Sequence, residues 1–556
     1  SDGSSDSDFE PFSDSESDES STSDEQPQTS SESESDTAAP SAGPSRKRVR
    51  QNETDWKKGE DFSPSIFPFD ASHSGQPAGT LLQPDAKEAD YFKLYFDEGV
   101  ASLIADETND YAHQLIAQPD LARKSRLKAW VDVGLSEIYC FLAAVLLMGL
   151  VRKNAVRDYW TTDPMTETPF LSKLFSVNRF CLLLRVLHFS ASTDAADRLR
   201  KIRPLMETLQ AKFASLLVPY QDLCINESMM PWRGRLSFRQ YLPSKRHRFG
   251  VKMFVLCDVM TGYILRFIVY TGASTTMTMM KELGFSGSVV LELLNHYLGK
   301  GHSLFVDNWY TSPALFQYLQ GKQTNACGTV RQNRKGLPKF KKKMRKGEVE
   351  TFHTDTLLAL KWCDKKEVHM LTSMHGASLE DTGKVDRRTG TPQKKPACVL
   401  EYNQRMGLVD KVDMPLSFTE SIRKTLKWYK KFFFHLLDMS LLNAFLLHRE
   451  KSASKITFAE FRRRVIYQIV EEHHTERRKG GRPSGDNPTR LTARHFLERV
   501  PQTSAKGSRT QRRCHVCANT VLRPRQRKDT RFMCAECDKA LCAEPCFKDY
   551  HTLKKY

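Results

Sequence analysis

The chain has 556 residues, with 84 Lys and Arg against 66 Asp and Glu, a net charge of +18. This length allows several domains and at least one large core. The first 45 residues hold 13 acids and no Lys or Arg, so the rest carries 84 basic residues against 53 acids, a surplus of 31. Such a surplus favours a polyanionic partner, nucleic acid above all, over a merely soluble basic protein. The longest apolar runs are too short or too interrupted to span a membrane.

The N-terminal region, residues 1–87, is expected to be acidic and disordered. Ser alternates with Asp and Glu up to about residue 45, and a segment with so few apolar groups cannot bury enough surface to fold. A basic cluster follows, which is either a nuclear-import signal or a charge-balancing linker. Its basic residues are Arg46, Lys47, Arg48 and Arg50. Since no secretory signal opens the sequence, we expect a nuclear protein with reduced thiols.

Helical patterns dominate after residue 88, and strands follow them. Apolar residues at helical spacing run through much of residues 88–247, and a strand is predicted near its end, over 223–227. Two antiparallel strands are then predicted over 254–258 and 264–269, and a further strand over 304–306. Ser312 and Pro313 have the residue types that cap and open a helix. The order of elements predicts an α/β core behind a helical region.

Single acids follow two of these predicted strands. Asp258 and Asp307 each end an apolar strand, and Asp410 and Asp413 precede a long helical pattern. Carboxylates meeting from separate elements are the ligands that Mg²⁺ or Mn²⁺ prefers, and such a centre can cleave a phosphodiester. The 49-residue separation of Asp258 and Asp307 fits a ribonuclease-H-like core. The alternative for each acid alone is an ordinary turn or cap carboxylate.

The second half of the chain contains an insertion and two long helices. Alternating segments over 348–353, 357–362 and 368–372 predict a small β-rich insertion, closed by a strand-like piece over 397–402. Helical patterns return over 419–449 and 458–470.

Cysteines crowd near the C-terminus. Six of the 13 lie in two Cys-x₂-Cys pairs and two later positions: Cys514, Cys517, Cys534, Cys537, Cys542 and Cys546. With His551 they form a ligand set typical of tetrahedral zinc, and in a reducing compartment zinc is favoured over disulfides. Two full sites need eight ligands. Either His515 is the eighth, or one of the two sites is incomplete.

Basic and aromatic residues interleave beside the predicted acidic site. Cations neutralise phosphate and aromatic rings stack on bases, so these residues are candidates for DNA binding, although scaffold packing explains the aromatics equally well. The candidates are Arg233, Arg235, Lys245, Arg246, Arg248, Lys424, Lys427, Trp428 and Arg482.

These motifs, in this order, resemble those of the piggyBac transposases. The resemblance rests on Asn226-Glu227, Trp232 to Arg235, Cys257-Asp258, the block from Asp307 to Ser312, and Val409 to Asp413, followed by the cysteine cluster. It covers about residues 88–556, and the block from Asp307 to Ser312 is its most specific part. The cysteine spacing after Cys542 differs from the type member, which leaves the pairing of ligands open.

The resemblance implies a dimeric cut-and-paste DNA transposase that uses divalent metal. Its catalytic aspartates would be Asp258, Asp307 and Asp410, with Asp413 in support and Trp428 near the cleaved end. Water would nick each transposon end, the freed 3′-OH would form a hairpin, and the reopened end would join TTAA target DNA. One or two zinc ions in the cysteine module would help to recognise the terminal repeats. The alternatives are a domesticated DNA-binding zinc protein without catalysis and a nuclease without strand transfer.

The expected architecture is therefore an α/β and α multidomain chain. A ribonuclease-H-like catalytic core is interrupted by a β-rich insertion and flanked by helical dimerisation and DNA-binding segments. The expected divisions are a disordered acidic region (1–87), a helical domain (88–247 and 419–475), a catalytic core (248–335 and 400–418), an insertion (336–399), a basic linker (476–510) and a zinc-binding domain (511–556).

Overall fold

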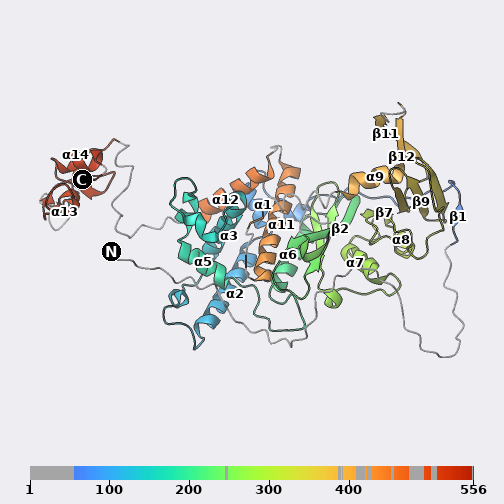
Figure 1. The fold of residues 1–556 in the computed structure, drawn as a ribbon, viewed down its shortest axis with the longest axis horizontal. Coiled ribbons are helices and arrows are strands. Elements are labelled where there is room, and N and C mark those ends of the chain that lie inside the picture. The colour runs from blue at the N-terminus through green and yellow to red at the C-terminus, as the bar shows by residue number, and fades with distance from the viewer. Residues whose placement is uncertain are drawn as a thin grey trace.

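The computed structural model describes residues 55–243, 248–385, 390, 392–407, 420–421, 425, 427–452, 456–474, 494–502, 510–553 and 555–556. Within them the chain forms a helical part, a large mixed sheet and a small C-terminal cysteine-rich unit (Figure 1). None of the helices in these ranges combines the length and the apolar character that crossing a bilayer requires.

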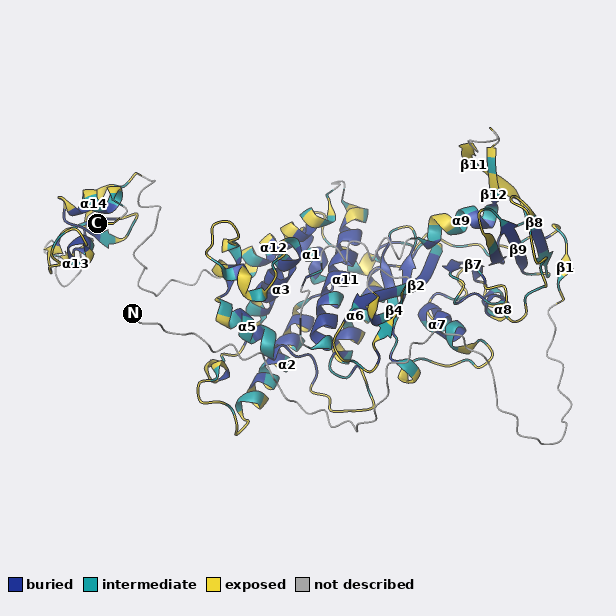
Figure 2. Cartoon of the chain, in the orientation of Figure 1, coloured by how far each residue is buried: buried dark blue, intermediate teal, exposed yellow. Residues whose placement is uncertain are grey.

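The helical part is assembled from two segments far apart in the sequence. Helix α11 lies at its centre and is buried almost all round, with 19 of its 24 residues buried. Such all-round burial is typical of a helix inside a core. Figure 2 shows α11 and α3 in the dark blue of buried residues. The helices are α1 (Glu88–Lys93), α2 (Glu98–Ile116), α3 (Leu135–Leu150), α4 (Pro169–Leu174), α5 (Val177–Val186), α6 (Arg203–Leu216), α11 (Trp428–Lys451) and α12 (Phe458–His473).

Polar contacts inside the core fix how the helices meet. The fully buried Arg462 of α12 donates to the backbone oxygen of Leu146 in α3 at 2.8 Å and pairs with Asp438 of α11 at 3.2 Å. A buried guanidinium is tolerated only when its donors are satisfied in this way. Asn443 of α11 exchanges two hydrogen bonds of 2.9 Å with the backbone of Ile264 and so ties the helices to the sheet.

The large sheet contains a five-strand unit in the order β5-β4-β2-β6-β7. Strand β4 pairs antiparallel with both β2 and β5. Strand β6 runs parallel to β2, and β7 runs parallel to β6. Helix α7 leads into β6, and α8 connects β6 to β7, as parallel strands require a crossover. The elements are β2 (Asp222–Pro231), β3 (Gln240–Tyr241), β4 (Phe249–Asp258), β5 (Ile264–Val269), α7 (Gly284–Leu294), β6 (Ser303–Val306), α8 (Pro313–Gly321) and β7 (Asn325–Thr329).

The expected strands over 254–258, 264–269 and 304–306 are confirmed, as is the helix start at Ser312 and Pro313. The Ser312 side chain accepts a hydrogen bond from the Leu315 amide, and Pro313 occupies the first turn. The sequence does not predict the position of β2 in the sheet. This strand lies between β4 and β6, so the strand that carries Asp258 is not the one beside β6.

The β-rich insertion continues the same sheet, because its strand β10 pairs with β7. The predicted insertion strands are confirmed as β8 (Val349–His353), β9 (Leu358–Cys363) and β10 (Glu367–Thr372). The prediction of a strand over 397–402 is wrong, because α9 (Ala397–Met406) covers these residues. A pattern of only six residues fits both the strand period and the helix period, so it does not distinguish the two. The remaining strands here are β1 (Lys57–Lys58), β11 (Leu379–Val385) and β12 (Pro392–Pro396).

The C-terminal unit has a small apolar cluster of its own, made largely of cysteines and aromatic residues. Its secondary structure is short: β13 (Leu497–Arg499), β14 (Arg512–Arg513), α13 (His515–Asn519), β15 (Asp529–Thr530), β16 (Phe532–Cys534), β17 (Lys539–Ala540) and α14 (Cys546–Thr552). A unit this small needs a further stabilising element, such as a structural metal ion, in addition to its apolar core.

Candidate metal centres and DNA-binding residues

Four cysteines of the C-terminal unit converge on one point. The sulfur atoms of Cys514, Cys517, Cys542 and Cys546 all lie within 4.8 Å of one another, and all four residues are buried. The Cys517 sulfur lies 3.5 Å from that of Cys546 and 3.9 Å from that of Cys542. Every cysteine of the chain is free of disulfide bonds. Four thiol groups in such a cluster fit a tetrahedral Zn²⁺ site.

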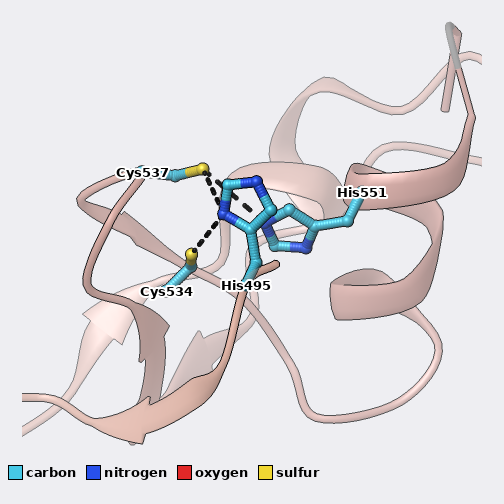
Figure 3. Close-up of side chains that lie close together, drawn as sticks. All are labelled: His495, Cys534, Cys537 and His551. Carbon is cyan, nitrogen blue, oxygen red and sulfur yellow. Dashed lines mark hydrogen bonds between the residues drawn. The ribbon is translucent and has the colours of Figure 1, made fainter. Parts of the chain in front are cut away.

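Two histidines and two cysteines form a second cluster (Figure 3). His495 precedes β13 and places its Nδ1 atom 3.5 Å from the Cys534 sulfur and 3.4 Å from the Cys537 sulfur. His551 on α14 places its Nε2 atom 3.6 Å from the Cys537 sulfur. The Nδ1 atom of His551 lies 2.8 Å from the Phe547 carbonyl oxygen, the second contact that holds a metal-binding imidazole in place.

The two clusters interleave along the chain. The second cluster contains both the first of the eight ligands in the sequence, His495, and the last, His551. The two Cys-x₂-Cys pairs belong to different clusters. Each prospective ion would therefore tie together segments that are apart in sequence. Because structural zinc supplies folding free energy, both clusters are expected to hold the module together.

The eighth ligand is His495, and the suggestion of His515 is wrong. The Nε2 atom of His515 lies 2.9 Å from the Tyr556 hydroxyl, and its ring packs edge-on against Tyr550. His495 is 19 residues before the first cysteine, inside the range assigned to the basic linker. No Cys-x₂-Cys or His-x₃-His spacing marks it, so only the pairing of β13 with β16 brings it to the cluster.

Asp258, the first predicted catalytic acid, is sealed inside the fold. Its side chain is fully buried. One carboxylate oxygen accepts the Tyr220 amide at 2.8 Å, and the other accepts the Thr261 amide and hydroxyl at 2.8 and 2.7 Å. Burial raises the pKa of Asp258, and these hydrogen bonds act in the opposite direction. The residue closes the turn between β4 and β5 and anchors the segment before β2.

Asp307, the second predicted acid, follows β6. Its carboxylate accepts the Trp309 amide at 2.8 Å. Burial, and after it the nearby negative charge of Glu227, raises the pKa of Asp307 to about 6. The hydroxyl of Tyr310 is buried with no hydrogen-bond partner among the described residues. Burial raises its pKa, and the charges of Glu227 and Asp307 raise it further. Asp307 therefore has Glu227 of β2 as its acidic neighbour.

The structure does not bring Asp258 and Asp307 together. Asp258 pairs with Leu223 near the start of β2, whereas Val306 pairs with Ile225, so Asp307 comes level with Asn226. Across the sheet the two residues are two strand spacings apart, and along the strands they are about three residues apart. Their Cα atoms are therefore separated by about 14 Å. Two ligands of one metal ion cannot be so far apart, which disfavours the predicted role of Asp258.

The central strand offers a neutral residue at the level of Asp307. The Asn226 amide oxygen accepts the Glu227 backbone amide at 2.8 Å. Glu227 in turn pairs with Lys252 of β4 at 3.4 Å, and the Lys252 ammonium lies 4.8 Å from the ring centroids of both Phe254 and Trp309. A divalent ion prefers carboxylates to the neutral amide of Asn226, and Lys252 competes with such an ion for Glu227. The described residues of this centre therefore do not fit a two-metal site.

Several predicted residues lie outside the described parts of the chain. They are Asp410 and Asp413, the DNA-binding candidates Lys245, Arg246, Lys424 and Arg482, and the basic cluster of Arg46, Lys47, Arg48 and Arg50.

The remaining DNA-binding candidates border one loop. Arg233 and Arg235 are exposed in the loop between β2 and β3, and Arg248 is exposed just before β4. Trp428, half-buried at the start of α11, packs edge-on against Phe238 of the same loop with ring centroids 5.3 Å apart, and Lys427 precedes it. Gly234 allows the tight loop, because a Cβ atom there would lie 2.6 Å from the Trp232 ring.

The chain combines a mixed α/β multidomain fold with a terminal zinc-finger module. Comparison with known proteins identifies the family that has this combination. Residues 87–445 match the family described as Transposase IS4, and residues 494–552 match the DDE_Tnp_1-like zinc finger. A protein with this pair of domains is a transposase relative.

Individual relatives make the assignment specific. The chain is 27% identical over 531 residues to the human PiggyBac transposable element-derived protein 3, covering 92% of this chain and 83% of the relative. It is 26% identical over 461 residues to the human PiggyBac transposable element-derived protein 2, covering 79% and 74%. The fold resembles the cryo-EM structure of the piggyBac transposase synaptic complex with hairpin DNA, with a TM-score of 0.63 and 22% identity, covering 85% of this chain and 100% of that one. The chain belongs to the piggyBac transposase family.

Proposed function

We propose that the protein is a nuclear, double-stranded DNA-binding member of this family that recognises transposon terminal repeats without cutting them. The observation that carries the proposal is the neutral Asn226 level with Asp307, together with the sealed position of Asp258. The fold supports DNA as the partner, because its neighbour is a transposase bound to hairpin DNA.

Two regions would contact the DNA in this proposal. The loop with exposed Arg233 and Arg235 beside Trp428 supplies cations and an aromatic ring on one surface, which suits a phosphate backbone with accessible bases. The zinc module carries exposed basic residues such as Arg512 and Arg513 near its first cluster, and we propose that it reads the repeat. A homodimer, by analogy with the family, would bind two ends at once.

The complete transposase reaction is the second candidate. It is favoured by Asp307 and by the acids Asp410 and Asp413, which the sequence retains. In this case each end would be nicked, the freed 3′-OH would form a hairpin, and the element would enter TTAA DNA. A five-strand order of three antiparallel and two parallel strands supports the ribonuclease-H-like assignment that this reaction requires. In this candidate Asp307, Asp410 and Asp413 would hold a magnesium ion, which would supply Lewis-acid chemistry at the phosphodiester.

One experiment separates the two candidates. The full chain is incubated with Mg²⁺ or Mn²⁺ and labelled duplexes carrying the repeats that flank its own gene, with a TTAA plasmid as target. A retarded complex with intact DNA supports the binding protein. Hairpin ends and joined products establish the transposase, and cleavage without joining indicates a nuclease. Equal retardation of a scrambled duplex would exclude recognition of terminal repeats.

A further inference from the structure

A strongly basic loop lies on the insertion, between β7 and β8. Residues 335–346, here called the basic loop, contain seven cations and no acid, and every one of these cations is exposed. They are Lys335, Lys339, Lys341, Lys342, Lys343, Arg345 and Lys346. Within the described part of the chain, no carboxylate lies at ion-pair distance from Lys339, Lys342 or Lys343. Seven positive charges on 12 residues attract a polyanion strongly at low salt.

The backbone of the basic loop is held against the sheet while its charged side chains face outward. The Phe340 ring packs edge-on against Phe352 and His369, with centroids 5.3 and 5.4 Å apart. The buried Glu350 accepts the Lys341 amide at 2.8 Å, and Lys361 donates to the Lys341 carbonyl oxygen at 2.7 Å. The loop is thus a pre-positioned charged surface, which lowers the entropic cost of binding a partner.

The N-terminal part of the chain enters the fold beside this loop. Strand β1 (Lys57–Lys58) pairs with β8 on the edge of the insertion sheet, and the Trp56 indole donates to the Gly336 carbonyl oxygen at 2.8 Å. Gly336 belongs to the basic loop. The acidic residues up to position 45, here called the acidic head, are therefore joined to this surface by only about ten residues, which span at most about 35 Å. A tether this short gives the acidic head a local concentration at the basic loop on the order of millimolar.

We propose that the acidic head docks on the basic loop of its own chain and competes there with DNA. The head offers 13 acids and no basic residue against the seven cations of the loop. Charge complementarity and the short tether favour this occupant over a separate protein. The competition with DNA rests on the proposed function, whereas the docking itself does not.

Cross-linking of the full chain tests the docking. A zero-length carbodiimide reagent joins carboxylates to lysines in contact, and mass spectrometry locates the joined residues. We expect links from the acidic head to the basic loop at 50 mM salt and their loss at 0.5 M salt, because surface charges are then screened. The triple variant Lys341→Ser, Lys342→Ser, Lys343→Ser should also lose most of the links to the unchanged Lys335, Lys339 and Lys346, because three of the seven attracting charges are gone.

A matched control keeps the docking falsifiable. Arg123→Ser, Lys124→Ser, Lys128→Ser removes three exposed cations from the segment between α2 and α3 and should leave the links unchanged. Head links spread evenly over all exposed lysines, or concentrated away from residues 335–346, would overturn the docking.

DNA affinity tests the competition separately. Replacing the head acids by Asn and Gln in the full chain should raise affinity for a random-sequence duplex by about tenfold at 50 mM salt, since the loop is then open to phosphate. Unchanged affinity alongside intact head-to-loop links would exclude competition but leave the docking standing. Absence of any DNA binding would instead count against the proposed function.

Discussion

The zinc module and the metal site of the large sheet were both predicted from metal-binding residue types, and the two predictions had different outcomes. In the module, each Cys-x₂-Cys pair brings two sulfurs together through a single turn, so local sequence places half of each ligand set, whereas His495 depends on strand pairing. In the sheet, Asp258 and Asp307 follow similar apolar strands, yet the intervening β2 moves them to different levels. Local spacing predicts a site well only where the ligands are local.

Zinc content is the strongest test of this difference. His495→Ala should reduce the bound zinc from two ions to one per chain and unfold much of the module, since each structural zinc contributes about 10–16 kcal/mol. His515→Ala, on the neighbouring segment, should retain both ions. Metal analysis of the purified proteins and circular dichroism of the module measure the two effects. Two ions in the first variant and one in the second would return the ligand role to His515.

Asp258 should matter for stability and not for metal binding. Asp258→Ala leaves the Tyr220 amide and both Thr261 donors without their acceptor inside the fold. The free energy of unfolding should fall by about 3 kcal/mol, measured by urea denaturation. Asp307→Ala should cost less, because it leaves the Trp309 amide without its acceptor but also removes a buried carboxylate that lies near the negative charge of Glu227. Normal stability with weakened Mn²⁺ binding in Asp258→Ala would support the original assignment.

Acid should weaken the helical part through His188. Burial, followed by the charges of Lys430 and Lys201, lowers the pKa of His188 to about 4. The unfolded chain takes up this proton more readily, so stability is full above about pH 6.5 and falls as pH drops towards 4, by about 2 kcal/mol at pH 5.

The control is His188→Phe, which keeps a ring stacked on Tyr111. This variant should show a shallower loss of stability in urea titrations between pH 7 and 5. An identical slope would show that His188 does not titrate as its burial implies.

Asn226→Asp should strengthen metal binding at the described centre. A carboxylate level with Asp307 would add a hard oxygen ligand, and Mn²⁺ binding should tighten about tenfold, or about 1.4 kcal/mol. Electron paramagnetic resonance of Mn²⁺ titrations measures it independently of cleavage. Asn295→Asp, at an exposed site after α7, is the matched control. Equal affinity in all three proteins would remove Asn226 from the centre.

Much of the fold was accessible from the sequence, because its strands and helices have clear periods. The insertion strands, the capped start of α8 and the long buried α11 follow directly from local pattern. Register was not accessible, since the pairing of β2 with β4 and with β6 joins residues that are 19 to 35 and 81 positions apart in the sequence, respectively. His495 was not predicted as a ligand for the same reason, because only the pairing of β13 with β16 brings it to Cys534. The role of the candidate acids outside the described residues stays a prediction.

The short strand β1 has a practical implication for handling the protein. It covers the outer edge of β8, and an uncovered strand edge presents free amide and carbonyl groups to other chains. Trimming the N-terminus to residue 60 would remove this cover along with the Trp56 indole. Such a shortened protein should self-associate through Val349–His353, so an N-terminal deletion meant to improve solubility should stop before Asp55.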